Sequence, residues 1–159
     1  MTTPAAALLL ASLCFAAPAA LAQGNDLPPA VDLRAESERA GRQGGPLVVL
    51  YTRRDCKYCE SVKRDFLKPL ADNPRYRDKV VVRQVNQDSD AALADFRGRA
   101  TTHARLAADE KIRLVPVVAF YGPGGGRLAD PIVGARLPDF YQSYLEEAID
   151  RSAAALRQR

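Results

Sequence analysis

Short apolar runs alternate with polar, helix-prone stretches along most of this chain. Leu47–Tyr51 and Lys79–Val85 are rich in β-branched residues and are bounded by turn-forming residues, which predicts two buried strands. Arg113–Tyr121 predicts a third strand with a proline near its start. After the glycine turn at 122–126, Arg127–Val133 predicts a fourth strand that returns antiparallel. Together these runs predict a central mixed four-stranded sheet.

Two helices are predicted before the second strand. Ala30–Gln43 is polar and rich in Glu, Arg and Ala, with Asp32 near its start, which indicates a surface helix. From Cys56 onward, apolar residues recur at helical spacing. This pattern predicts a helix that runs to about Leu67 and kinks or stops near Pro69.

Two further helices are predicted in the second half of the chain. Ala91–Glu110 is helix-prone and is interrupted at Gly98, and the pattern does not fix its register. Leu137–Leu156 predicts a closing amphipathic helix. We expect the core side of this helix to carry Phe140, Tyr141, Tyr144, Leu145, Ala148 and Ile149. The order β-α-β-α-β-β-α, with an extra N-terminal helix, predicts an α/β fold whose sheet is flanked by helices.

The first 22 residues differ in composition from the rest. From Ala5 to Ala22 they are almost entirely Ala and Leu, and Ala20-Leu21-Ala22 gives a small-x-small pattern before Gln23. This predicts a signal peptide over residues 1–22 and a periplasmic or secreted protein. Disulfides persist in those compartments. An uncleaved membrane anchor is the alternative, although about 18 apolar residues interrupted by a proline are short for a bilayer span.

The remaining chain divides into an N-terminal linker and helix at 23–45, a main domain at 46–150 and a C-terminal tail at 151–159. The net charge of +4 comes from basic residues scattered among acidic ones rather than gathered in a stripe. No nucleic-acid partner is therefore expected. Membrane contact is expected only through an uncleaved signal segment, and the oligomeric state is left open.

Cys56 and Cys59 are the only cysteines outside the predicted signal segment, which contains Cys14. Two thiols three residues apart lie on one helix face about 5–6 Å apart, inside the range of a disulfide. Such a short loop removes little entropy from the unfolded chain, so the pair is a poor staple and redox chemistry is favoured. No cofactor is expected, because a copper or zinc carrier, the minor alternative, would need further soft ligands.

The two cysteines are expected to have different roles. Cys56 begins the predicted helix, where unpaired N–H groups and the helix dipole favour a thiolate with a low pKa. Arg53, Arg54 and Lys57 add positive charge nearby, and Asp55 partly opposes it. We expect Cys56 to attack and the buried Cys59 to resolve the mixed disulfide. These groups leave the direction of electron flow open, and thiolate stabilisation tilts it towards an oxidant.

The strand order, the Cys56-x-x-Cys59 pair opening the first core helix and Val115-Pro116 before the third strand together resemble the thioredoxin superfamily over 46–150. They look most like its exported thiol:disulfide oxidoreductases. The resemblance implies a thioredoxin-like fold, protein thiol or disulfide substrates and a redox partner protein. It also implies a cis Val115–Pro116 bond whose exposed Val115 backbone pairs with an extended substrate. A trans proline starting an edge strand is the alternative.

One position departs from that family. Thioredoxins carry a buried carboxylate six residues before the first cysteine, and Leu50 occupies this position here. The departure implies that no dedicated buried base serves the second cysteine, unless Glu60, Asp55 or a water substitutes for it. Tyr58 is expected either to contact substrates or to cap the exposed helix end, and His103 to lie at the surface. A non-catalytic binding or chaperone module is the alternative function.

Overall fold

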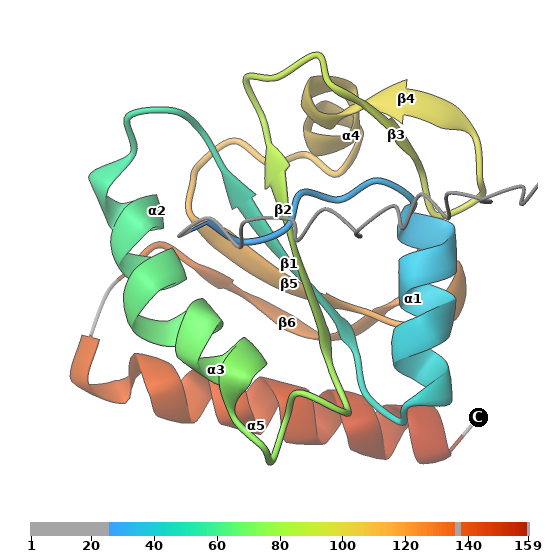
Figure 1. Ribbon diagram of the computed structural model, residues 1–159, viewed down its shortest axis with the longest axis vertical. Helices are drawn as coiled ribbons and strands as arrows, with labels where there is room; N and C mark the ends of the chain where they lie inside the picture. The colour runs from blue at the N-terminus through green and yellow to red at the C-terminus, as the bar shows by residue number, and fades with distance from the viewer. Residues whose placement is uncertain (1–25, 136–137, 159) are drawn as a thin grey trace, which may run out of the picture.

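The computed structural model describes residues 26–135 and 138–158 (Figure 1). The predicted signal segment, its cleavage position and Cys14 therefore lie outside the described residues. Within those residues, no helix combines the length and the apolar character that crossing a membrane requires.

A four-stranded sheet forms the centre of the molecule. Its order is β2-β1-β5-β6, from Val81–Asn86, Leu47–Thr52, Val117–Tyr121 and Arg127–Val133. β1 runs parallel to β2 and antiparallel to β5, and β6 is antiparallel to β5. The predicted mixed sheet and its fourth, antiparallel strand are confirmed. The third strand begins later than predicted, because residues 113–116 form a loop.

Both faces of the sheet are covered, as the burial of all six residues of β1 requires. Val48 and Leu50 point into one apolar cluster, which packs against the helices following β1 and the C-terminal helix. Val49 and Tyr51 point into a second cluster on the opposite face. The predicted α/β fold, with a sheet flanked by helices, is confirmed (Figure 1).

The helix after β1 is longer than predicted. It comprises α2 (Lys57–Val62), a π-helical turn at Lys63–Leu67 and α3 (Lys68–Asp72). The Lys68 N–H donates to the carbonyl of Lys63, five residues back, and Pro69 follows in the first turn of α3. The π-helical turn changes the hydrogen-bond register directly before this proline, which has no N–H, and the helix continues past it.

Within the segment 91–110, only His103–Asp109 is helical. The segment contains a hairpin of β3 (Ala92–Ala94) and β4 (Ala100–Thr102), and then α4 (His103–Asp109). The hairpin turns at Gly98, whose φ is +76°, while the Asp95 carboxylate accepts from two backbone N–H groups of the turn. The prediction of a helix before Gly98 was wrong, because this side-chain-capped turn favours strand pairing.

The C-terminal helix α5 spans Pro138–Arg157, close to the predicted Leu137–Leu156. Its buried residues include Tyr141, Leu145, Ala148 and Ile149. Phe140 and Tyr144 were wrongly assigned to the core, since they are 57% and 46% exposed. Each lies one residue, or about 100° around the helix, from the buried stripe.

The N-terminal segment packs tightly against the sheet, whereas residues 24–29 were interpreted as a linker. Leu27 is buried, and the backbone of Gln84 in β2 exchanges hydrogen bonds with Pro28 and Ala30. This pairing extends the sheet edge beside β2. Helix α1 (Leu33–Arg42) follows, with the Asp32 side chain accepting from the backbone N–H of its first turn.

Candidate active site

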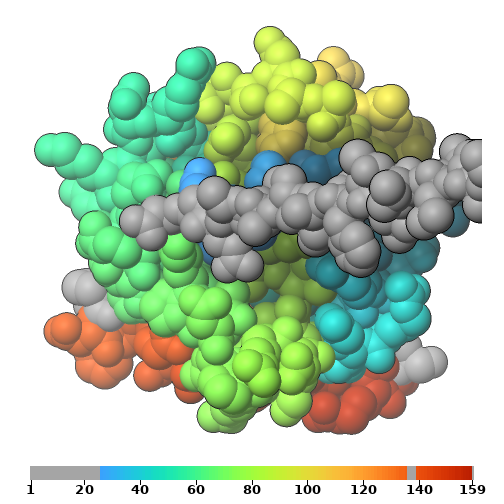
Figure 2. Space-filling model, in the orientation of Figure 1, coloured from blue at the N-terminus to red at the C-terminus, as the bar shows by residue number. Residues whose placement is uncertain are grey.

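The Cys56–Cys59 disulfide lies at the end of β1 where the chain enters α2. The two sulfurs are bonded, and the Cα atoms are 5.2 Å apart. Cys56 is 8% exposed and Cys59 is fully buried. Only Cys56 therefore offers surface to an attacking group. Figure 2 shows the segment joining β1 to α2 projecting at the upper left of the molecule.

Local backbone geometry places Cys56 at the beginning of the helix. Its φ and ψ are extended, and its Sγ accepts a hydrogen bond of 3.2 Å from the backbone N–H of Cys59. Asp55, just before it, adopts a left-handed φ of +56°, a conformation that Asp tolerates better than most residues. The Cys59 N–H of the first helical turn is directed at the Cys56 sulfur, which favours the thiolate over the thiol.

The basic residues predicted to lower the pKa of Cys56 differ in their contacts with carboxylates. The backbone N–H and Nε of Arg54 both donate to Asp88, at 3.1 and 3.2 Å, which pairs its charge with a carboxylate. Burial of Asp88 opposes its ionisation, but these hydrogen bonds outweigh it and hold the pKa of Asp88 below its ordinary value. Lys57 is exposed in the first helical turn. Arg53 lines an open hollow of about 540 Å³ beside the disulfide.

The loop before β5 lies beside the disulfide. Tyr51 pairs with Val117 in the antiparallel ladder, so continuing the register brings 113–116 next to the residues that lead into Cys56. The Val115–Pro116 peptide bond is cis, and the Pro116 carbonyl accepts a 2.8 Å hydrogen bond from Gly134. Pro116 is buried and Val115 is partly exposed, outside the strand ladders.

Exposed apolar side chains occur at this same end of the sheet. Tyr58 is 70% exposed, Leu114 69% and Val133 53%. Val133 pairs with Val117 in the ladder, which places it at the edge where the cis-proline loop joins β5. Of the three, the sequence indicated only Tyr58. Nothing in the sequence separates Leu114 from the buried valines that follow it.

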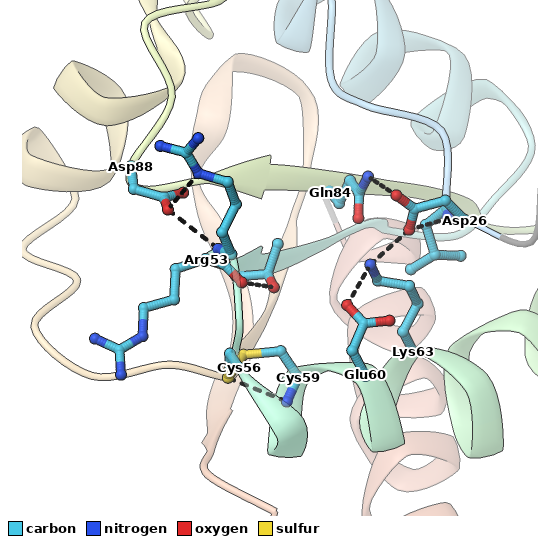
Figure 3. Close-up of polar contacts among 11 residues, drawn as sticks. Asp26, Arg53, Cys56, Cys59, Glu60, Lys63, Gln84 and Asp88 are labelled. Atoms are coloured by element: carbon cyan, nitrogen blue, oxygen red, sulfur yellow. Dashed lines mark hydrogen bonds and ion pairs between the residues drawn. A yellow bond between two sulfur atoms is a disulfide. The ribbon is translucent and has the colours of Figure 1, made fainter.

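A charged cluster that the sequence did not reveal lies along the same helix. The buried Lys63 amine contacts the Asp26 carboxylate at 2.5 Å and the Glu60 carboxylate at 3.0 Å (Figure 3). Gln84 on β2 donates to the other Asp26 oxygen at 3.0 Å. Leu50 faces Gln84 across the β1–β2 ladder. Glu60 was a possible substitute for the carboxylate missing at Leu50, and here it pairs with Lys63.

The ionised forms of the cluster are favoured despite burial. Burial opposes the charged form of Lys63, but the hydrogen bonds that its ammonium donates to Asp26 and Glu60 outweigh burial and raise the lysine pKa. Burial likewise opposes ionisation of Asp26, and its hydrogen bonds from Lys63 and Gln84 hold its pKa below the ordinary value. Both groups are therefore charged near neutral pH.

His103 lies away from this site, and its predicted surface position was wrong. It is 3% exposed, its Nδ1 accepts from the Asn86 backbone N–H, and its Nε2 contacts the Ala30 carbonyl at 3.1 Å. It joins the N-terminal segment to β2. Over 26–135 and 138–158, no group of three or more His, Cys, Asp or Glu side chains is placed to hold a metal ion.

Comparison with known proteins agrees with this arrangement. A family model described as "Thioredoxin-like domain" matches residues 33–149. The solved structure of thioredoxin from Malassezia sympodialis is similar, with a TM-score of 0.53, 20% identity and coverage of 80% of this chain and 94% of that one. Mitochondrial thioredoxin 3 from Saccharomyces cerevisiae, in its oxidised form, has a TM-score of 0.51 and 17% identity over 78% of this chain and 93% of its own. No curated protein matched.

Proposed function

Since this chain belongs to the thioredoxin-like family, we propose that it is a thiol:disulfide oxidoreductase that exchanges its Cys56–Cys59 disulfide with protein substrates. The observation that carries the proposal is the contrast in exposure within the pair. Cys56 reaches the surface at a helix N-terminus and Cys59 does not. The exposed Cys56 sulfur can therefore form the mixed disulfide with the partner, and the buried Cys59 sulfur can release the partner from it.

The exchange proceeds through a mixed disulfide on Cys56. In the reducing direction, the Cys56 thiolate attacks one substrate sulfur, and the other substrate sulfur leaves as a thiolate and is protonated. The Cys59 thiol loses its proton, its thiolate attacks the Cys56 sulfur, and the substrate leaves as a second thiolate. Two electrons pass from the dithiol to the substrate disulfide. The same steps in reverse oxidise a substrate dithiol.

The surroundings of Cys56 suit an extended polypeptide substrate. Tyr58 and Leu114 expose apolar surface on two sides of the disulfide, and the Val115 backbone lies outside the ladders. A substrate segment would pair with the Val115 backbone as a short added strand, with its own apolar side chains against Tyr58 and Leu114.

We further propose that the protein is exported and that it works with a redox partner protein. The apolar segment at 5–22 supports export to the periplasm or beyond. Disulfides persist there, so a dedicated redox partner protein would return the pair to its working oxidation state.

The test is trapping of the mixed disulfide. Cys59→Ser should retain a covalent adduct with substrate proteins on Cys56, visible as species that collapse with dithiothreitol on non-reducing gels. Cys56→Ser is the matched control and should trap none. Equilibration of the native protein with glutathione buffers should give one two-electron transition. The proposal fails if Cys59→Ser forms no adduct, and unchanged cellular function of the double serine variant would favour the binding-module alternative.

A further inference from the structure

Cys59 has a charged neighbour one helical turn away that the exchange reaction above does not use. The Lys63 backbone N–H donates to the carbonyls of Cys59 and Glu60, and residues at i and i+4 share a helix face. Cys59 is fully buried and Lys63 is 6% exposed, so this shared face is the one that packs on the sheet. Lys63 is the only buried charged side chain in the described part of the protein.

We propose that the cluster of Lys63, Asp26 and Glu60 sets how readily the Cys59 thiol loses its proton, and so the rate at which Cys59 resolves a mixed disulfide. This inference rests on the proposed function and assigns positioning residues within it.

The arrangement of charge in the cluster gives the expected sign. The ammonium of Lys63 is buried, while the Asp26 and Glu60 side chains are 60% and 61% exposed. The positive charge therefore acts through the interior, where screening is weak, and the two negative charges lie largely in solvent. Lys63 favours the Cys59 thiolate, and each carboxylate reduces that effect.

Gln84 holds the cluster in place. Its Nε2 donates to Asp26, while its own Oε1 is buried without a hydrogen-bond partner among the described residues. A buried amide is costly to leave half satisfied, so its retention beside Leu50 indicates a polar requirement on this face of the sheet. Asp26 is further fixed by the backbone N–H of Leu27, which donates to its Oδ1 at 2.9 Å (Figure 3).

Few other ionisable groups lie around Cys59. The exposed charged groups on the neighbouring segments are Arg53, Arg54, Asp55, Lys57 and Arg113. On the helical side, burial raises the pKa of Tyr76 and Tyr141, so both are neutral near pH 7. The β1 and β5 residues in the apolar cluster on this face are Val48, Leu50, Val118 and Phe120. Lys63 is consequently the nearest buried charge that can act on the thiol through the interior.

The resolving step can be measured separately. Reduced protein attacks 5,5′-dithiobis(2-nitrobenzoate) through Cys56 and releases one coloured thiolate. Cys59 then loses its proton, its thiolate attacks the Cys56 sulfur, the Cys56–Cys59 bond forms and a second coloured thiolate leaves. The pH dependence of the second release reports the ionisation of Cys59, and that of the first release reports Cys56.

Opposite shifts are expected from the two kinds of variant. Asp26→Asn and Glu60→Gln should move the midpoint of the second-release profile to lower pH, with about a threefold faster rate at pH 7. Lys63→Met should move it to higher pH and slow the step by about threefold, whereas Lys63→Arg should behave like the native protein. Asp150→Asn removes an exposed carboxylate paired with Arg75 and is the matched control, with no expected shift.

Two results would overturn the inference. One is an unshifted profile in Asp26→Asn, and the other is a shift in the same direction for the lysine and carboxylate variants, which general loosening of the helix would give. Asp26→Asn keeps the size of the side chain and decides the question if Lys63→Met does not fold. A normal first release with unshifted second releases rejects only this inference, whereas no mixed disulfide on Cys59→Ser rejects the proposed function itself.

Discussion

The hydroxyl groups of Tyr51 and Tyr121 lie 2.7 Å apart in the core, on adjacent strands of the sheet. Tyr121 also donates to Glu110 at 2.8 Å, and Arg127 contacts the same carboxylate oxygen at 3.0 Å. Tyr51 is thus the donor to Tyr121, and the chain of hydrogen bonds runs from the central strand to the surface. Burial raises the pKa of both tyrosines, so both retain their protons across the physiological range.

Removing the middle hydroxyl should cost more stability than removing the inner one. Tyr121→Phe leaves the fully buried Tyr51 hydroxyl without its acceptor, at a cost of about 1–3 kcal/mol. Tyr51→Phe keeps the bond from Tyr121 to Glu110 and should cost about 1 kcal/mol or less. Urea unfolding of the two variants measures the difference. Equal losses would contradict this network.

Stability should depend on pH through His103. Burial lowers the pKa of this imidazole, so the folded protein keeps it neutral where the unfolded chain takes up a proton. The contribution is complete above the unfolded value of about 6.5 and is lost as the pH falls below it towards the folded value. The urea midpoint should therefore drop between pH 7.5 and 5.5.

His103→Gln is the control for that titration. At pH 7.5 its unfolding free energy should be lower by about 1–2 kcal/mol, because the hydrogen bonds to Asn86 and Ala30 are disturbed. Its urea midpoint should fall accordingly. Its midpoint should also be nearly flat over the same pH interval. If the urea midpoints of the native protein and of the variant fall in parallel with pH, the titrating group is not His103.

Protein substrates should depend on the exposed apolar side chains next to the disulfide. Tyr58→Ala and Leu114→Ala should each lower kcat/KM for a protein disulfide by about five- to tenfold, because each loses an apolar contact in the complex. Exchange with glutathione should be unchanged, and so should the melting temperature, since both side chains are exposed. Phe140→Ala on α5 is a control of similar exposure. A parallel loss with glutathione would indicate damage to the disulfide itself.

Lys57 should contribute to the reactivity of Cys56 more than Arg54 does. Lys57 is exposed, and no carboxylate in the described part of the chain pairs with it, whereas Arg54 is paired with Asp88. Lys57→Met should lower the thiolate fraction of Cys56 and slow its first attack at pH 7 by about twofold. Arg54→Met should have a smaller effect. Thiolate absorbance near 240 nm during a pH titration of the reduced protein provides the measurement.

The sequence predicted the strands and the redox pair because both depend on local pattern. β1 is an uninterrupted apolar run, and the spacing of Cys56 and Cys59 is itself short. Segment 91–98 was wrongly predicted because its helix propensity is overridden by a turn capped by the Asp95 side chain. Propensity over so few residues is weaker than one such set of hydrogen bonds.

The charged cluster could not be predicted, because its members come from three distant parts of the chain. Asp26 lies just after the predicted signal segment, Lys63 in the core helix and Gln84 on β2. Each reads as an ordinary surface residue in its own sequence context. Lys63 pairs with Asp26 in the N-terminal segment, which runs beside β2, and no local pattern indicates that pairing.

The connectivity of β1 implies an order of assembly. Its two neighbours, β2 and β5, lie far along the chain, and Tyr51 meets Tyr121 across 70 residues. A chain that emerges from its N-terminus can bring Cys56 and Cys59 together almost at once, since three residues separate them. The strands that shield Cys59 arrive only when residue 121 does. Before the sheet is complete neither sulfur is shielded by it, so the difference in exposure between Cys56 and Cys59 arises only with the completed sheet.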